Sequence, residues 1–328
     1  MKRTFVLGLD LGGTKIAAGV VSRSGMLVSA VRMPTPARGV KRDLQALFDS
    51  ANTPLAAARV RWKGIRAVGV GVPGAFDTRT ETVWAPNLRG WKKVPLRRLL
   101  ERAFRRPVFV EGDRNVQALA EAWLSGGNRR PPRNLVFLTL GTGIGAGIIA
   151  EGRMISGSRG TAGAAGWLAV SEHWRPEFGR TGSLEALAAG PGIARTAARL
   201  ARGKKSGALA RMARAEGSLT AEAVVRAARA GDRLACKTLE AAGESLGRGV
   251  ASIVALLNPE LVVIGGGLAE AGELLIGPLR RAALKWGQPL ASRQVRIVRT
   301  RLGENNGLLG AARYAMLEID DHDNRGRG

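Results

Sequence analysis

The chain contains one short arrangement twice: an apolar strand, a glycine-rich turn and a second apolar strand. It occurs at residues 7–20 and again at residues 137–150. Short apolar runs bounded by glycine are typical of buried strands. The repetition predicts two similar halves rather than one domain with a tail, and the polar segment 126–133, which contains Pro131 and Pro132, is the best candidate for a linker.

Strands and helices alternate along most of the chain, which predicts an α/β fold. Before the linker we expect strands at 5–10, 16–22, 27–32, 67–72 and 108–110, and helices at 43–58, 95–106 and 115–124. After it we expect strands at 135–140, 147–150, 261–264 and 296–299, and helices at 184–202, 220–229, 233–257, 273–285 and 308–317. The polar tail 320–328 is predicted to be disordered.

Composition excludes several classes of protein. With 328 residues and 45% hydrophobic content, the chain can bury the cores of about two domains. The single cysteine, Cys236, cannot form an internal disulfide. The most apolar later stretch, 249–267, is interrupted by Asn258-Pro259-Glu260, which excludes a transmembrane helix, and the N-terminus is a poor signal peptide. We therefore expect a cytoplasmic protein with no membrane partner.

The net charge of +25 is the unusual property of this composition. Such a charge is compatible with a nucleic-acid-binding protein. However, the arginines are spread along the chain instead of forming one block, which favours an arginine-rich surface. We therefore regard a nucleic-acid partner as the weaker interpretation.

Three glycine turns point to phosphate chemistry, because a turn without side chains lets backbone N–H groups converge on an anion. The turns contain Gly12, Gly13 and Thr14, then Gly141, Thr142 and Gly143, and finally residues 265–267. Each could be an ordinary turn. Together and in this order they favour a nucleotide, with Asp10 placed to hold a water of Mg²⁺ and Lys15 to neutralise phosphate charge.

Asp113 is the candidate general base. It follows the strand at 108–110 and begins a helix, where the helix dipole favours the ionised carboxylate. A plain helix N-cap is the competing interpretation. Histidine occurs only at His173 and His322, so histidine-based catalysis and a Cys/His metal site have too few residues.

Six motifs give the chain a resemblance to the ROK family of sugar kinases and related repressors. They are LDLGGTK at 9–15, GVPG at 71–74, APNL at 85–88 with GW at 90–91, LGTGIG at 140–145, NPELVVIGGG at 258–267 and GENNG at 303–307. The resemblance runs from about residue 5 to residue 315 in the family's order. It implies an actin-like ATPase (ribonuclease H-like) fold, with two α/β domains around an interdomain cleft.

The resemblance also implies boundaries, partners and chemistry. We expect an N-terminal domain at 1–112 plus 311–328, a larger C-terminal domain at 113–310, and a homodimer. No helix-turn-helix domain precedes the first strand, so we expect a carbohydrate kinase that uses ATP and Mg²⁺ and phosphorylates a hydroxyl of a sugar or polyol. The alternative is a catalytically weak or inactive regulator that binds nucleotide or sugar, and polyphosphate is a second possible donor.

Site residues are carried over from the family position by position. Asp10, Gly12, Gly13, Thr14 and Lys15 match the first phosphate motif, and Gly141, Thr142 and Gly143 match the second. Gly266 and Gly267 match the adenosine loop. Asp113 matches the catalytic base, and Gly74, Asn87 and Glu185 match sugar-contacting positions.

The chain also departs from the family pattern. Gly112 stands where the family usually has Asn, and residues 163–167 end in Trp167 where the family has Gly-Glu-Ile-Gly-His. The loss of these sugar contacts argues against glucose as the preferred substrate and favours a polyol that stacks on Trp167. The three zinc cysteines align with Pro176, Phe178 and Ser183, so no zinc is expected and packing by Trp167, Trp174 and Phe178 is predicted to replace it.

Overall fold

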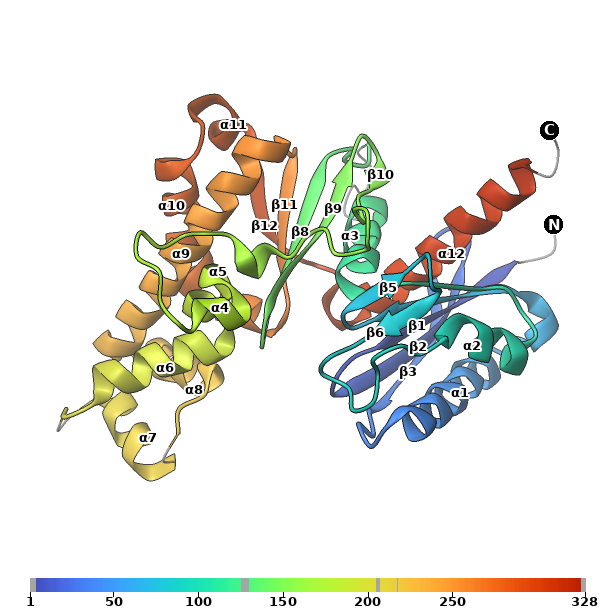
Figure 1. The fold of residues 1–328 in the computed structure, drawn as a ribbon, viewed down its shortest axis with the longest axis horizontal. Coiled ribbons are helices and arrows are strands. Elements are labelled where there is room, and N and C mark those ends of the chain that lie inside the picture. Colours follow the sequence, from blue (N-terminus) through green and yellow to red (C-terminus); the bar gives the residue numbers. More distant parts are fainter. Residues whose placement is uncertain (1–3, 125–129, 205–206, 217, 326–328) are drawn as a thin grey trace. The chain divides into compact units, whose positions relative to one another are not determined.

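The computed structural model describes residues 4–124, 130–204, 207–216 and 218–325 (Figure 1). Its first sheet has five strands in the order β3-β2-β1-β4-β7. They are β1 (Phe5–Leu11), β2 (Lys15–Ser22), β3 (Leu27–Pro34), β4 (Ile65–Val72) and β7 (Val108–Gly112). β2 runs antiparallel to β1 and β3, whereas β1, β4 and β7 are parallel.

Helices cover both faces of this sheet. The helices α1 (Val40–Ala57) and α2 (Leu96–Phe104) pack in one cluster with Leu7, Leu9 and Leu11, whereas α3 (Asp113–Leu124) and α12 (Asn306–Arg325) pack in another with Val6. Successive side chains of a strand point to opposite faces. Asp10 therefore lies on the face of β1 that α12 covers.

The second sheet has the order β10-β9-β8-β11-β12. Its strands are β8 (Leu135–Leu140), β9 (Ile144–Ala150), β10 (Arg153–Met154), β11 (Leu261–Gly265) and β12 (Arg296–Arg299). β11 is parallel to both β8 and β12. Parallel strands buried on both faces need continuous apolar sequences, as β8 and β11 have.

The remaining elements are short strands, helices and single turns. They are η1 (Trp62–Gly64), β5 (Ala75–Asp77), β6 (Thr82–Trp84), η2 (Ala165–Trp167), α4 (Phe178–Thr181), α5 (Ser183–Ala188), α6 (Gly190–Ala201), α7 (Ala208–Glu216), α8 (Ala221–Arg229), α9 (Arg233–Leu257), η3 (Gly267–Ala271), α10 (Glu273–Trp286), α11 (Pro289–Gln294) and η4 (Gly303–Asn305). Within the described part of the chain, none of the helices is long and apolar enough to cross a membrane.

The contacts within the chain divide it into two units. Unit 1 comprises 1–133, 147–162 and 301–328, and unit 2 comprises 134–146 and 163–300. This division keeps Asp113 and α3 with the first sheet, whereas the boundaries expected from the sequence assign them to the second domain. Those expected boundaries, 112/113 and 310/311, stay a prediction. Half of the expected linker, residues 126–129, lies outside the described residues.

Two sequence predictions are wrong in detail. The single helix expected at 184–202 is two helices, because Ala189 is extended (φ −76°, ψ 167°) ahead of Pro191, whose ring is compatible only with the first turn of a new helix. The tail expected to be disordered from residue 320 is helical as far as Arg325.

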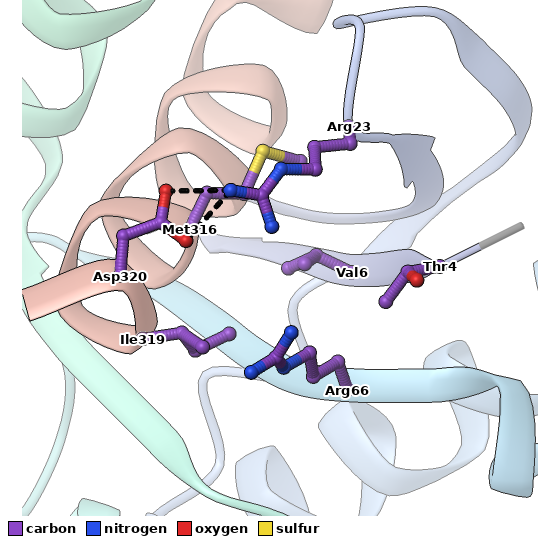
Figure 2. Close-up of a pocket in the computed structure, with 7 residues that line it drawn as sticks. All are labelled: Thr4, Val6, Arg23, Arg66, Met316, Ile319 and Asp320. Atoms are coloured by element: carbon purple, nitrogen blue, oxygen red, sulfur yellow. Dashed lines mark hydrogen bonds and ion pairs between the residues drawn. The ribbon is translucent and has the colours of Figure 1, made fainter. Parts of the chain in front are cut away.

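Two ion pairs join this longer helix to unit 1. Arg23, in the turn between β2 and β3, donates to both carboxylate oxygens of Asp320, at 2.8 and 3.0 Å (Figure 2). Arg66, on β4, pairs with Asp323. Acidic groups near a helix C-terminus are unfavourable for the helix dipole. The two arginines offset that charge and hold the last turns of α12.

Candidate functional site

The turn between β1 and β2 is held by its own backbone and by Thr35. The N–H of Gly12 donates to the carbonyl of Lys15 at 2.8 Å, and the hydroxyl of Thr35 donates to the carbonyl of Gly12 at 2.7 Å. A Cβ placed on Gly13 would meet no atom within 4 Å, so this side of the turn is open. The turn is thus ordered and leaves room for an anion to approach the backbone.

Asp10 lies at the end of β1 in a crowded position. A Cβ on Gly307 would come within 2.1 Å of its Oδ2, and a Cβ on Gly71 within 3.3 Å of its Oδ1. Burial and the carboxylate of Asp113 raise the pKa of Asp10 from 3.8 to about 7, and Lys15 opposes this rise. Asp10 and Asp113, more than 100 residues apart in the sequence, are therefore electrostatic neighbours in unit 1.

Asp113 is the first residue of α3, and no residue separates it from β7. Its Oδ1 accepts the backbone N–H of Arg114 at 2.7 Å. Burial raises the pKa of this carboxyl. The abrupt change from strand to helix leaves the side chain at a helix N-terminus, beside Gly112.

Glu111, which the sequence analysis did not select, supports this junction from within. Its side chain is buried, Oε1 accepts from the N–H of Gly112 at 2.7 Å and from Nδ2 of Asn115 at 3.0 Å, and Oε2 accepts from Ser156 at 3.4 Å. Burial raises its pKa. The sequence pattern that could have identified Glu111 is an acidic residue inside an otherwise apolar strand.

Lys15 lies on the exposed side of the same turn. Its ammonium pairs with Glu304, which also lies 3.6 Å from Nε of Arg32. Arg32 donates to the neighbouring Asn305 as well. The segment before α12 therefore lies against Lys15 at the first turn and against Arg32 on β3.

Gly74 and Asn87 flank the hairpin of β5 and β6. Gly74 has φ +99°, and a Cβ there would lie 2.2 Å from the carbonyl oxygen of Trp84, so the position requires glycine. Asn87 is exposed on the turn that follows the hairpin.

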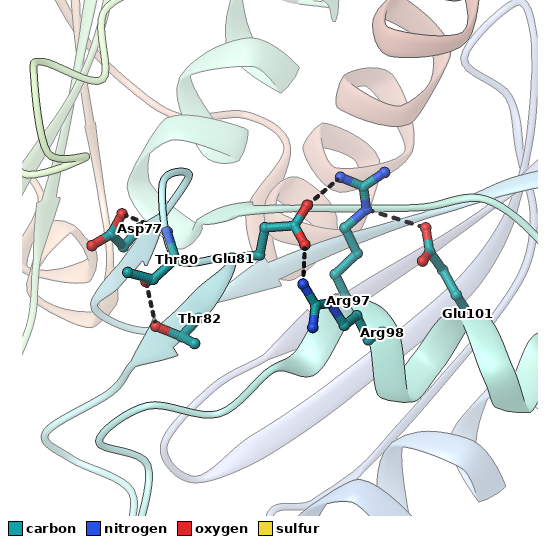
Figure 3. A network of polar contacts seen from close by, with 7 residues as sticks. All are labelled: Asp77, Thr80, Glu81, Thr82, Arg97, Arg98 and Glu101. Atoms are coloured by element: carbon teal, nitrogen blue, oxygen red, sulfur yellow. Dashed lines mark hydrogen bonds and ion pairs between the residues drawn. The ribbon is translucent and has the colours of Figure 1, made fainter.

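Polar contacts fix this hairpin and the loop after it. Glu81, at the hairpin turn, pairs with Arg97 and Arg98 of α2 at 3.1 and 3.3 Å (Figure 3). The loop that carries Asn87 ends at buried Trp91, whose Nε1 donates to Asp43 of α1 at 2.9 Å. The backbone on both sides of Gly74 and Asn87 is therefore anchored to the helices of unit 1.

In unit 2, the second turn is built around Glu185. Its Oε2 accepts the N–H of Ile144 at 2.7 Å, and a Cβ on Gly143 would lie 2.8 Å from the same oxygen. The N–H of Gly190 donates to the carbonyl of Gly141 at 2.9 Å. Burial raises the pKa of Glu185. The carboxylate thus holds the glycine turn in place.

A cavity of about 480 Å³ opens beside this turn. It is lined by Gly141, Thr142, Gly190, Pro191, Ala194, Leu219, Thr220, Ala221, Glu222, Gly267 and Leu268. Gly266 has φ +83°, and a Cβ there would lie 2.3 Å from the carbonyl oxygen of Leu140. Apolar walls, two glycine turns and a few polar groups suit a nucleoside with phosphates.

Hydrogen bonds of Ser183 hold the segment that aligns with the zinc motif of the family. Ser183 donates to the carbonyl of Leu168 at 2.8 Å and accepts the N–H of Val170 at 2.9 Å. Phe178 is buried, but Trp167 and Trp174 are 58% and 72% exposed, so the expected packing by both tryptophans is wrong. Among the described residues, no group of three or more His, Cys, Asp or Glu side chains could hold a metal ion.

The predicted site residues thus fall into two groups. Unit 1 carries Asp10, Gly12, Gly13, Thr14, Lys15, Gly74, Asn87, Gly112 and Asp113, and unit 2 carries Gly141, Thr142, Gly143, Trp167, Glu185, Gly266 and Gly267. Within each unit, residues that are distant in sequence lie together.

Comparison with known proteins identifies the family of the chain. The sequence profile of the ROK family matches residues 6–317. A glucokinase of Thermotoga maritima is 34% identical over 316 residues, which covers 95% of this chain and 97% of the relative.

Solved structures give the same result. A ROK hexokinase from Thermus thermophilus superposes with a TM-score of 0.77 at 37% identity. The match covers 97% of this chain and 100% of the hexokinase chain. A ROK family glucokinase from Streptomyces griseus, solved in complex with glucose and AMPPNP, has a TM-score of 0.77 at 30% identity. The match covers 94% of this chain and 98% of the glucokinase chain. These relatives confirm the predicted actin-like ATPase fold and the predicted enzyme class, a carbohydrate kinase. The chain belongs to the ROK family.

Proposed function

We propose that the protein transfers the γ-phosphoryl group of ATP to a hydroxyl of a sugar or sugar-like polyol, with Asp113 as the general base. The observation that carries this proposal is the position of Asp113, at the start of α3 and within electrostatic reach of Asp10 beside the first glycine turn. The relatives of the protein include glucokinases and N-acetylmannosamine kinases, which supports a sugar as the acceptor.

In the proposed reaction, Asp113 accepts the proton of the attacking hydroxyl. A bond forms between that oxygen and the γ-phosphorus, the bond from this phosphorus to the bridging oxygen breaks, and ADP leaves. The N-terminus of α3 favours the ionised carboxylate that a base requires, which opposes the effect of its burial. Lys15 would balance phosphate charge after exchanging Glu304 for the phosphate.

The nucleotide would bind through the two glycine turns and the cavity of unit 2. In unit 1, Gly12, Gly13 and Thr14 would offer backbone N–H groups to the phosphates, and in unit 2 Gly141, Thr142 and Gly143 would do the same. Gly266 and Gly267 would lie along the adenosine.

Asp10 offers the carboxylate oxygen that a hard cation prefers, directly or through water, so the residues present fit Mg²⁺ bound with the nucleotide. When bound, Mg²⁺ would neutralise negative charge on the phosphates.

For the acceptor we propose contacts with Gly74, Asn87, Gly112, Glu185 and Trp167. Exposed Trp167 offers an aromatic face, and Glu185 offers hydrogen-bond acceptors close to Gly166, which precedes Trp167. Since Gly112 has no side chain to bind a hydroxyl, the site suits a polyol with an apolar face better than a fully hydroxylated hexose.

The role of Trp167 can be tested by its replacement with alanine. Trp167→Ala is expected to raise the KM for the acceptor about 3- to 10-fold through lost stacking. The KM for ATP should not change, because Trp167 is not among the residues that line the cavity of unit 2. Trp174→Ala is the matched control, since that side chain is also exposed. Equal acceptor KM values in both variants would contradict the assignment.

The proposed function is tested by measuring ADP release with a panel of hexoses, amino sugars, N-acetyl sugars and cyclitols, with ATP or polyphosphate as donor. We expect turnover with ATP and at least one member of the panel. Binding of AMPPNP without turnover of any acceptor would instead support the alternative, a nucleotide- or sugar-binding regulator. Sedimentation of the same preparation would test the expected homodimer.

A further inference from the structure

In the function proposed above, Glu304 serves only as the partner that Lys15 gives up, and residues 305–307 have no role, yet each residue of the segment Glu304 to Gly307 contacts a side chain elsewhere in unit 1. Glu304 pairs with Lys15, and Asn305 accepts from Arg32. Asn306 donates to Glu121, and Gly307 lies against Asp10. Four consecutive residues therefore meet side chains that are far away in the sequence.

Gly307 and Asp10 leave no room for a side chain between them. A Cβ on Gly307 would lie 2.1 Å from Oδ2 and 2.4 Å from Cγ of Asp10, whereas real Cβ atoms essentially never approach such atoms within 3.0 Å. Any side chain at position 307 must therefore displace the carboxylate or the start of α12.

The start of α12 cannot easily move away. A Cβ on Gly8 would lie 2.1 Å from the carbonyl oxygen of Leu308, and a Cβ on Gly69 would lie 1.8 Å from that of Ala311. These distances show that the backbone of α12 rests directly on β1 and β4. Close-packed backbones transmit strain instead of absorbing it.

The buried pair of Asn306 and Glu121 fixes the same end of α12 to α3. Nδ2 of Asn306 donates to Oε1 of Glu121 at 3.0 Å, and the two residues are 4% and 1% exposed. Loss of a hydrogen-bond partner is costly for a polar group buried in this way. This hydrogen bond ties the first residue of α12, directly before Gly307, to α3.

We propose that Gly307, held in place by Asn306, is a positioning residue that fixes the carboxylate of Asp10 against the N-terminus of α12. The proposal rests on the function proposed above, in which Asp10 supports the phosphates and their Mg²⁺. Gly307 itself contacts no reacting atom in this proposal. It acts only through Asp10.

The test is Gly307→Ala, alone and combined with Asp10→Asn. Since the carboxylate must move by about 1 Å, kcat should fall about 10- to 100-fold in the wild-type background. In the Asp10→Asn background the same change should alter kcat less than 2-fold, because residues that act as one unit are not additive. Calorimetry provides a second readout: both single variants should lose the gain in AMPPNP affinity that Mg²⁺ produces.

Two further variants keep this test decisive. Gly277→Ala, in α10, is the matched control, since its Cβ would make only ordinary contacts at 3.5 Å or more. If Gly307→Ala does not fold, Asn306→Ala should give a smaller loss of kcat and the same loss of the Mg²⁺ effect. Wild-type kcat in Gly307→Ala, or an equal loss with and without Asp10, would overturn the proposal. A wild-type protein with no kinase activity would instead contradict the proposed function.

Discussion

Replacing Asp113 by asparagine should abolish turnover and leave the affinity for ATP nearly unchanged. General-base catalysis contributes about 10²- to 10⁴-fold, and an amide cannot accept the hydroxyl proton. Asparagine keeps the size of the side chain and the oxygen that accepts the N–H of Arg114. The start of α3 should therefore remain intact. Steady-state kcat and calorimetry with AMPPNP measure the two effects separately.

A control and the pH profile sharpen this prediction. Asp49→Asn, on the exposed side of α1, should leave kcat unchanged. Because burial raises the pKa of Asp113, the base form is lost at a higher pH than for a free aspartate, so kcat/KM should fall as the pH drops, with a midpoint above 3.8. Activity of the Asp113→Asn variant comparable to wild type would rule out the role of general base.

Local sequence patterns were sufficient to predict most elements of the fold. The strand expected at 67–72 is β4, and the helix expected at 233–257 is α9 with the same bounds. Apolar periodicity carries this information because it reports which face is buried. It does not predict the helical residues 320–325, in which Asp320 and Asp323 pair with Arg23 and Arg66, residues distant in the sequence.

The candidate site was predictable to the extent that it consists of turns. Gly12, Gly13 and Gly141 stand where backbone geometry alone suggests an anion site, and a Cβ on Gly13 or Gly141 would meet no atom within 4 Å. Glu111 and Gly307 were missed for different reasons. Glu111 is a single acidic residue in an apolar strand, and Gly307 matters only through a contact with Asp10, almost 300 residues away, that no local pattern encodes.

Replacing Asp10 by asparagine should have two opposite effects, a loss of activity and a gain in stability. An amide removes the negative charge that the proposed site offers to Mg²⁺, so kcat should fall by about two orders of magnitude, as for other electrostatic groups of active sites. The same amide removes a carboxylate whose ionisation is unfavourable in the fold, because burial and Asp113 raise its pKa to about 7. The free energy of unfolding should therefore increase at alkaline pH.

The pH dependence of this gain separates a charge effect from a packing effect. Below pH 3.8, Asp10 is protonated in both the folded and the unfolded chain, and the wild-type carboxyl carries no penalty. Between 3.8 and about 7 the unfolded chain loses the proton first, so wild-type stability falls as the pH rises. At about 1.4 kcal/mol per pKa unit, the full penalty above pH 7 is at most about 4 kcal/mol.

Thermal unfolding of both proteins from pH 4 to pH 8 should show melting temperatures that diverge by several degrees as the pH increases. A difference that does not change with pH would mean that burial and Asp113 do not raise the pKa of Asp10 in the folded protein.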